Sequence, residues 1–328
     1  MPGFGSNAIL GITKQNSFDG TSAPNSFFNV PFAKHDFNYN FSELIDDSIT
    51  GRYDAPDPTI GLQLVNGNIE HPFHPLVGGH FLRGAMGVYS VAAVGSGFTH
   101  QFKPQTTTFD TLASLPPFSF YLDQGETGVN TVYKLTDCFI NGLEFSAAAG
   151  GWLRANYIIV GKGTDVTTKL VPAGYGTGVV RPFPWSSISL SLFGAADQKW
   201  SDITFRFDNR IGQQTRLAAS KQYQYFFRDG FRDFGRISGT VDIAIDTWTR
   251  VKSETEGRLF MFAAGVTSIS SGVNEYLLID IPRFKFTAHP LGVSGPGIVQ
   301  VAVTGDAMYS STRGLIVAIT LQNTLSTY

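Results

Sequence analysis

Three histidines form the one group in this sequence with a hint of metal-ligand spacing. His71, His74 and His80 lie close together, Glu70 is the nearest carboxylate, and a proline directly follows two of them. Zinc sites usually combine four His, Cys or carboxylate ligands. The segment instead has the pattern of a turn that leads into a helix. We therefore expect structural histidines and no bound metal.

The other reactive residue types are not arranged for catalysis. Glu43, Asp46 and Asp47 are loop carboxylates, which are ordinarily solvated. The sequence has no Gly-x-Ser-x-Gly nucleophile elbow, and GYGTG (174–178) lacks the third glycine of a dinucleotide site and the lysine of a phosphate loop. These observations predict a protein that is not an enzyme and uses no cofactor.

Basic and aromatic residues are interleaved in RLAASKQYQYFFRDGFRDFGR, residues 216–236. Such mixtures occur on surfaces that bind single-stranded nucleic acid, where bases stack on aromatic rings. Nothing around the segment matches a nucleic-acid-binding module. We favour a loop whose aromatic side chains pack against a neighbouring protein.

Most of the elements that position these residues are expected to be β-strands. Apolar and polar residues alternate in DFNYNFSEL (36–44), SISLSLF (187–193) and DITFRFD (202–208). A period of two places successive side chains on opposite faces of a sheet. Each of these strands is therefore expected to have one buried face and one polar face.

Two segments carry helix signals. SETEGRLFMFAAG (253–265) begins with Ser253 and Glu256 at capping-box spacing and ends at Gly265. HPLVGGHFLRGAMG (74–87) has a proline in its first turn and a glycine at its end. Its internal glycines each cost about 1 kcal/mol of helix propensity. We expect one short helix in each segment.

The composition is that of a β-rich protein. Charged residues make up 15% of the 328 residues and hydrophobic residues 42%, with 36 glycines and 28 phenylalanines. The net charge of −2 argues against a nucleic-acid-binding protein held by a basic surface, and the single Cys138 excludes an intrachain disulfide. We find no secretory signal and no apolar run of the ~18 residues that span a membrane, so we expect a cytosol-made protein without membrane insertion.

The expected elements occur twice in the same order, which indicates an internal duplication. The matching pairs of segments are 35–45 with 201–211, 59–65 with 240–246, and 139–163 with 280–307. We expect a mainly β fold of two tandem β-sandwich or barrel modules, each with one flanking short helix.

The module boundaries follow from this repeat. The first module is expected at 1–173, with an N-terminal arm at 1–30 and an inserted segment at about 88–130. A linker rich in Gly and Pro covers 174–185, and the second module covers 186–328. The arm is rich in Gly, Asn and Ser, and we expect it to order on assembly.

Equivalent loops of the two modules carry opposite charge. Residues 46–58 have a net charge of −3 and residues 212–236 a net charge of +3. Such loops attract one another when the loop of one copy meets the other loop of a second copy. The pattern favours a protein that polymerises.

Taken in order along the chain, five segments resemble the tail tube proteins of long-tailed (siphovirus-type) bacterial and archaeal viruses. They are SELIDDSITGR (42–52), HFLRGAMG (80–87), FTHQFKP (98–104), YKLTDCFINGLEFSAAAGGWLRANYIIVGK (133–162) and WSDITFRFDNRI (200–211). The resemblance spans nearly the whole chain, and the order of the segments is more specific than any one of them.

The resemblance implies a structural virion protein of the tail tube. Modules of this family close side by side into a ring whose inner strands form a β-barrel, and the rings stack into a tube through which the genome leaves the capsid. A duplicated chain needs three copies for a pseudo-six-fold ring, so we expect a homotrimer. The implied partners are further copies of the chain, tape measure and tail-terminator or tail-tip proteins, and viral double-stranded DNA that passes without sequence-specific binding. The chain would be made in the host cytoplasm.

Polar strand faces and long loops provide the candidate functional residues. A polar lumen of mixed charge lets a polyanion slide, and its candidates are Asn38, Asn40, Gln63, Thr204, Arg206 and Asp242. The candidates for contacts between rings or subunits are Asp46, Asp47, Arg52, Asp54, Asp57, Arg216, Lys221, Arg228, Arg232 and Arg236.

Three alternatives share parts of this pattern. A β-sandwich receptor-binding, lectin-like virion protein has the same composition, but does not predict equivalent loops of opposite charge. An outer-membrane barrel conflicts with charged residues on most strand faces and with the missing signal. A hydrolase is supported only by scattered Asp, Glu and His residues. Of these hypotheses, only a tail tube protein is expected to form rings that grow into hollow rods.

Overall fold

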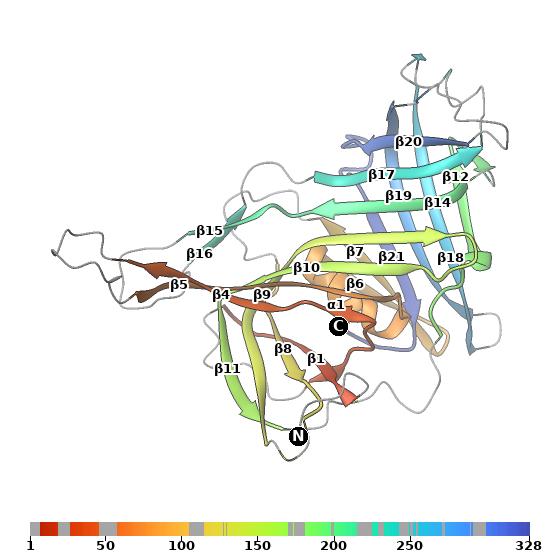
Figure 1. The fold of residues 1–328 in the computed structure, drawn as a ribbon. Helices are drawn as coiled ribbons and strands as arrows, with labels where there is room; N and C mark the ends of the chain where they lie inside the picture. Colours follow the sequence, from red (N-terminus) through yellow and green to blue (C-terminus); the bar gives the residue numbers. More distant parts are fainter. Residues whose placement is uncertain are drawn as a thin grey trace.

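A computed structural model gives a mainly β protein with antiparallel strand pairing (Figure 1). This confirms the fold class expected from the sequence. The structure describes residues 7–18, 27–45, 58–104, 115–126, 128, 130–169, 173, 181–197, 200–214, 225–228, 233–242, 249, 252–253, 255–270, 273–288, 290 and 300–328.

Eight strands form one continuous antiparallel surface, which we call the main sheet. They follow one another in the order β4, β5, β10, β9, β14, β17, β20 and β19. The bounds are β4 Asn38–Leu44, β5 Thr59–Pro72, β9 Thr131–Ala148, β10 Arg154–Gly161, β14 Trp200–Asp208, β17 Asp233–Asp242, β19 Val273–Ala288 and β20 Gln300–Ala307. The two halves of the chain are joined where β9 pairs with β14.

One face of the main sheet is apolar and buried. Ile203, Phe205 and Phe207 of β14 lie on it, as their alternation predicts, together with Phe145 of β9 and Tyr157 of β10. The side chains between them point to the other face and are half-buried or exposed. The sheet therefore presents a polar face to solvent.

A second layer of strands and one helix packs on the same core. Its strands pair in the order β6, β7, β21, β19, β18, β12 and β13, so that β19 belongs to both layers. The bounds are α1 Pro75–Met86, β6 Gly87–Val94, β7 Gly97–Pro104, β12 Ile188–Leu192, β13 Ala195–Asp197, β18 Glu256–Ser270 and β21 Ala318–Asn323. One hydrophobic core contains residues from both halves of the chain.

The remaining elements surround this body. β8 and β11 pair with the first half of β9, β1 pairs with β8 and β2, β3 pairs with β5, and β15 pairs with β16. The bounds are β1 Ile9–Lys14, β2 Phe28–Asn29, β3 Lys34–His35, β8 Phe118–Asp123, β11 Gly163–Thr168, β15 Ile211–Gln214, β16 Tyr225–Arg228 and the 3-10 turn η3 Trp185–Ser187.

The helix predicted at residues 74–87 is confirmed as α1. It begins with Pro75 in its first turn and ends before Gly87, whose φ of 90° suits a glycine. Every residue of the helix except Arg83 is buried. Its internal glycines allow close packing, because a Cβ on Gly84 would lie 2.6 Å from Ile140 Cγ1. Burial outweighs the low helix propensity of these glycines.

The helix predicted at residues 253–265 is wrong. Residues from Glu256 onward form β18, which pairs with β19. Leu259, Met261 and Ala263 alternate along this strand and are buried in the core. Pairing with β19 and burial of this alternating face override the capping-box signal. The expectation of one short helix in each module therefore fails for the second module at this position.

Strand β4 also departs from its predicted pattern. The alternation of residues 36–44 predicts one buried face, yet every residue of β4 is exposed. Tyr39 and Phe41 are 39% and 49% exposed, whereas Phe205 and Phe207 of β14 are buried. Both strands have the same alternation, but β14 lies inside the main sheet and β4 lies at its edge.

Candidate functional site

The polar face of the main sheet carries a row of mostly charged side chains that runs from β3, which pairs with β5, to β19. Successive cross-strand partners place them side by side, from β3 to β19. The row consists of Lys34, Glu70, Asn156, Glu144, Arg206, Arg236, Asp306 and Lys285. We call this set the charged row. It contains four cations and three anions, so its formal charges nearly cancel.

Ion pairs between neighbouring strands add to this balance. Arg154 Nη2 lies 2.6 Å from Glu70 Oε1, and Arg236 Nε lies 3.6 Å from Asp306 Oδ1. All four side chains are between 41% and 63% exposed. Exposed ion pairs are screened by water and salt and contribute little to stability. Their main effect is that the described residues of the polar face form no basic stripe that would hold a polyanion.

Amide side chains continue the polar face at the β4 edge. Asn38 Nδ2 donates to Asn40 Oδ1 at 2.8 Å, and Asn40 Nδ2 donates to Asn66 Oδ1 at 2.9 Å. Asn68 Nδ2 donates to Asp36 Oδ2 at 3.1 Å. These hydrogen bonds are exposed, and Asp36 is the one charged residue among those that form them.

Four of the predicted lumen residues lie together on the polar face. Asn38 and Asn40 are on β4, and Thr204 and Arg206 are on β14. Gln63 lies on the opposite face, because its cross-strand partner is Phe41 and not Asn40. Asp242 ends β17, and its side chain lies outside the described ones.

Arg236 is placed differently from its prediction. It was expected in a loop between rings, but it lies within β17, opposite Arg206 and paired with Asp306. The alternation of the strand puts it on the polar face of the main sheet. Residues 212–236 are therefore not one loop, since they include β16 and the start of β17.

The other predicted contact residues lie outside the described part of the chain. Arg228 ends β16, and its side chain is not among those described. The remaining predicted contact residues lie wholly outside the described part of the chain: Asp46, Asp47, Arg52, Asp54, Asp57, Arg216, Lys221 and Arg232.

Two of the three histidines that suggested a metal site, His71 and His80, are buried in the core. Burial lowers the pKa of His71 to about 4 and the pKa of His80 to about 3. His71 Nδ1 donates to the carbonyl oxygen of Pro72 at 2.6 Å, and its ring lies against Tyr157. Within the described residues, no three His, Cys, Asp or Glu side chains gather in a metal-binding arrangement.

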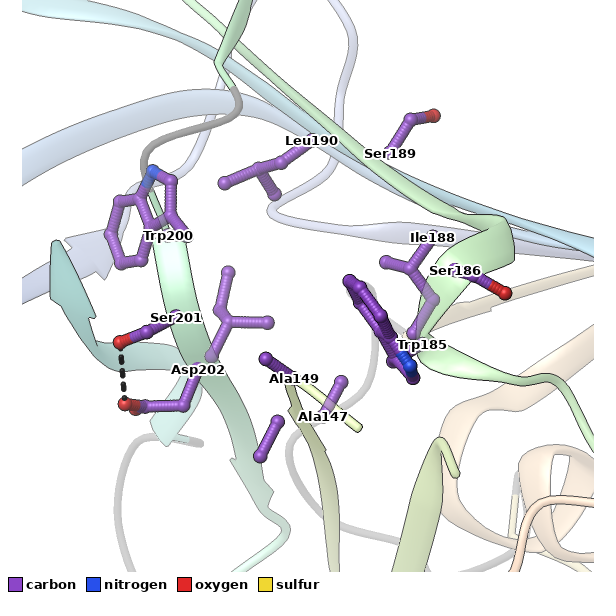
Figure 2. Close-up of a pocket in the computed structure, with 12 residues that line it drawn as sticks. Ala147, Ala149, Trp185, Ser186, Ile188, Ser189, Leu190, Trp200, Ser201 and Asp202 are labelled. Atoms are coloured by element: carbon purple, nitrogen blue, oxygen red, sulfur yellow. Dashed lines mark hydrogen bonds between the residues drawn. The ribbon is translucent and has the colours of Figure 1, made fainter. Parts of the chain in front are cut away.

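A groove opens at one end of the fold, beside the turn between β9 and β10 (Figure 2). Its volume is about 430 Å³, and it lies between the end of β9, the start of β14 and the η3–β12 segment. Trp185 and Trp200 stand on opposite sides, with Ala147 and Ala149 between them. Trp185 is 49% exposed. No pattern in the sequence predicted this groove, because its walls come from distant segments.

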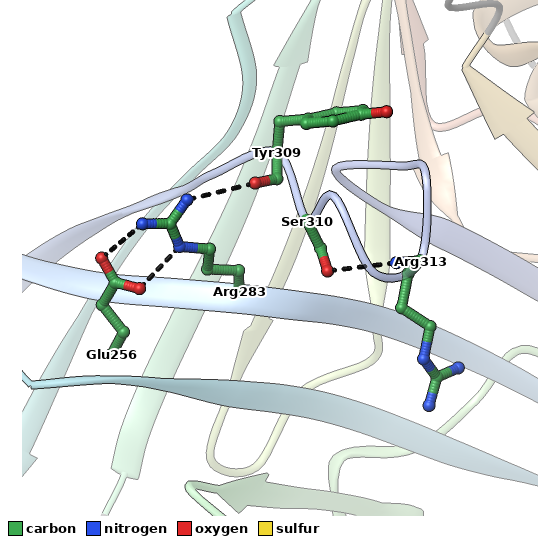
Figure 3. Close-up of polar contacts among 5 residues, drawn as sticks. All are labelled: Glu256, Arg283, Tyr309, Ser310 and Arg313. Carbon is green, nitrogen blue, oxygen red and sulfur yellow. Dashed lines mark hydrogen bonds and ion pairs between the residues drawn. The ribbon is translucent and has the colours of Figure 1, made fainter.

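Arg283 fixes the edge of the main sheet where β18, β19 and β20 meet (Figure 3). Its Nε and Nη2 donate to the two carboxylate oxygens of Glu256 at 2.6 and 2.7 Å, and its Nη1 donates to the Tyr309 carbonyl at 3.3 Å. This bidentate pairing lowers the pKa of Glu256 and raises that of Arg283. Glu256, predicted as a helix cap, instead ties β18 to β19.

The comparisons with known proteins bear on the whole chain. A family model described as "Phage tail tube protein" matches residues 5–307. No curated protein matches the chain. In the described part of the structure, no helix has the length and apolar character needed to cross a membrane.

Proposed function

We infer that copies of this chain, which belongs to the phage tail tube protein family, close into rings and stack into a hollow tube for genome passage. The family makes the protein a structural virion component of the tail. The finer statements about rings, lumen and partners are our proposal. A passive conduit needs no catalytic group, and we propose none.

The polar face of the main sheet is the observation that carries the proposal. The charged row has nearly balanced charge, and the rest of the face carries mainly amides, hydroxyls and exposed ion pairs, beside the half-buried Ile158 and Val160. Binding of DNA through its phosphates depends on accumulated positive charge. A face of this kind, turned toward a lumen, lets double-stranded DNA pass without holding it. Asn38, Asn40, Thr204 and Arg206 belong to our proposed lumen surface.

The edge strand β4 is our candidate for ring closure. Among the described residues, β4 pairs with β5 on one side and has no partner strand on its other side. Open strand edges with apolar side chains promote association with another chain. We propose that β4 of one copy adds to the far end of the main sheet of the next copy, at the end of β19 beyond Lys285, where β18 no longer pairs with it. Tyr39 and Phe41 then become covered, as Phe205 and Phe207 of β14 are covered within the chain.

The strand order supports three copies in each ring. The main sheet contains β4, β5, β10 and β9, followed by β14, β17, β20 and β19, with antiparallel neighbours throughout. Two modules, at 1–173 and 186–328 with a linker at 174–185, explain this repeated order. The contact between β9 and β14 is then the internal equivalent of the contact between copies. Three duplicated chains give six module positions.

The partners follow from the same proposal. Further copies of the chain form the ring and the stack, and tape measure and tail-terminator or tail-tip proteins set its length and ends. Viral double-stranded DNA is the cargo of the lumen. Synthesis takes place in the host cytoplasm before assembly into the virion.

Light scattering after size-exclusion chromatography tests ring closure through β4. We expect three chains per ring for the unmodified protein and monomers for Phe41→Asp, since a charge in a buried strand contact is costly. The matched control is Val166→Asp, which is 62% exposed and lies on β11, outside the main sheet. Rings of normal size from Phe41→Asp would contradict closure through β4. Compact monomers of the unmodified protein at all salt concentrations would favour the receptor-binding alternative.

A further inference from the structure

Strand β11 pairs with β9 on one side, and the described residues place no strand on its other side (Figure 1). β9 in turn pairs with β8, and β8 pairs with β1. The second half of the chain contains the same series, in which β21 pairs with β19, β19 with β18 and β18 with β12. Strand β21 therefore occupies the place in the second series that β11 occupies in the first.

The outer edge of β21 is covered by a further strand of the chain. Residues 98–102 of β7, which come from the first half, pair with it. Ile319 and Leu321 of β21 are buried, as are His100 and Phe102 of β7. The fold thus shows what covers an edge of this kind, namely an extended strand with buried side chains at alternate positions.

The chain has no second connection long enough to supply such a strand to β11. Residues 73–117 connect β5 to β8 and contain α1, β6 and β7. The corresponding connection in the second half, from β17 to β18, consists of residues 243–255. It is too short for a helix and a hairpin of the same size. Because β7 itself is engaged with β21, a strand that covers β11 has to come from a different polypeptide.

The open edge of β11 presents backbone groups in a regular pattern. Lys169, which directly follows the strand, donates its N–H to the Asn130 carbonyl oxygen at 2.7 Å. Bonded and non-bonded pairs alternate between antiparallel strands, so every second residue of β11 turns its backbone groups to the open side. These residues are Thr164, Val166 and Thr168.

The carboxylate of Asp165 caps the centre of this edge. The Val166 N–H donates to Asp165 Oδ1 at 2.8 Å, and both residues are exposed. The carboxylate therefore occupies the position in which the carbonyl group of an added strand would accept the same N–H. Capping by a charged side chain limits unspecific pairing at an edge. An exposed hydrogen bond of this kind adds little stability, so another acceptor can replace it.

A small pocket lies beside β11. Leu122 of β8, Tyr133 of β9 and Val166 of β11 are successive cross-strand partners, so their side chains share one face. Leu122 is buried, whereas Tyr133 and Val166 are 50% and 62% exposed. The pocket has a volume of about 160 Å³ and also has polar walls, which include Asp123 and Glu126. It suits one side chain with an apolar body and a polar tip.

We propose that β11 binds an extended segment of another polypeptide as an added β-strand. Main-chain hydrogen bonds to the open edge supply the affinity, and the pocket beside Tyr133 selects the side chain that enters it. The Asp165 carboxylate leaves the Val166 N–H when the strand binds. The added strand covers the exposed side chains of Tyr133 and Val166, as β7 covers β21 in the second half. This site is separate from the polar face and from the β4 edge.

A synthetic peptide with the β7 sequence GFTHQFKP (97–104) is the probe, because the chain itself adds this strand to β21. Fluorescence anisotropy of the labelled peptide measures its binding to the protein. We expect Val166→Pro, which removes the central N–H of the open edge, to weaken binding about ten-fold or more. Val91→Pro is the matched control, since β6 also has an edge without a partner strand in the described part of the chain. Equal binding by the two proline variants would overturn the proposal.

Asp165→Ala gives a second readout that misfolding cannot imitate. Removal of the carboxylate frees the Val166 N–H, so we expect the peptide to bind at least about two-fold more tightly. Unchanged or weaker binding would overturn the proposal, as would the absence of binding to the unmodified protein at millimolar peptide. Self-association of Asp165→Ala that Val166→Pro abolishes would show that a second copy is the occupant, and would overturn it as well.

The peptide assay does not depend on the proposed tube. Rings that form normally without peptide binding at β11 would overturn this inference alone. Peptide binding by a protein that forms no rings would support this inference and contradict the proposed ring assembly.

Discussion

Single residues in the core show how burial changes their chemistry. His71 is fully buried beside Tyr157, and burial lowers its pKa to about 4, with smaller contributions from His74 and Arg154. An unfolded chain has ordinary histidines that protonate near pH 6.5. The unfolded state therefore binds more protons between about pH 6.5 and pH 4, and stability falls as the pH falls through this range.

His71→Phe is expected to reduce this acid sensitivity. Each buried neutral histidine contributes a slope of up to about 1.4 kcal/mol per pH unit in that range. The phenyl ring keeps the apolar contacts and removes the titrating group. Urea denaturation of the monomer at several pH values between 7 and 4 measures the slope. An unchanged slope would show that His71 does not titrate as described.

The residues of the charged row could be found only in part from the sequence. Arg206 followed from a clean alternation with Phe205 and Phe207. Glu70, Glu144 and Asp306 did not, since their strands carry a weaker pattern and their neighbours are set by strand register. Register depends on pairing between distant segments, which a single sequence does not specify.

Single elements show where local signals and tertiary packing disagree. Helix α1 was predicted from a proline at its start and a glycine at its end, and both mark its bounds. β18 was predicted as a helix from Ser253 and Glu256, but its alternating apolar residues are buried against the core. Local capping signals are weak when a segment can also bury an alternating face.

Gly84→Ala in helix α1 is expected to destabilise the protein. Alanine improves helix propensity by about 1 kcal/mol, but its Cβ would lie 2.6 Å from Ile140 and 2.8 Å from Phe118. Overpacking of this kind costs about 1–3 kcal/mol. We expect a net loss of about 1 kcal/mol or more in urea denaturation. A gain in stability would mean that the helix moves freely on β9.

Strands β4 and β14 have the same alternation of apolar and polar residues but differ in burial. The same type of substitution should therefore cost different amounts of stability in the two strands. Phe205→Ala removes a fully buried ring and is expected to cost about 3–5 kcal/mol. Phe41→Ala removes a ring that is 49% exposed and is expected to change the stability of the monomer by about 0.5 kcal/mol or less. Denaturation of both monomers measures the difference. Equal losses would show that β4 is not a free edge in the monomer.

The whole molecule combines a closed core with open ends. One hydrophobic core joins both halves of the chain, while the polar face, the β4 edge and the groove stay open to solvent. The duplicated pattern and the resemblance to tail tube proteins were visible in the sequence. The groove and the charged row arise from contacts between distant segments and required the structure.

The charge balance of the polar face leads to a prediction for assembled tubes. Glu144→Lys places a third cation beside Arg206 and Arg236 and converts the centre of the charged row into a basic patch. We expect tubes of this variant to retain double-stranded DNA at low salt, with retention that weakens as salt rises. Asp165→Lys on β11 changes the charge equally outside the main sheet and serves as control. Equal retention of DNA by tubes of the two variants would argue against a lumen lined by this face.

The most direct test of the account is electron microscopy of the purified protein, with averaged end-on views. The account predicts hollow rings with three-fold symmetry and six similar lobes, each ring having three times the 35.7 kDa mass of the chain. Arg206 and Thr204 should face the channel. Compact particles without a lumen, or a channel lined by Tyr39 and Phe41, would contradict it.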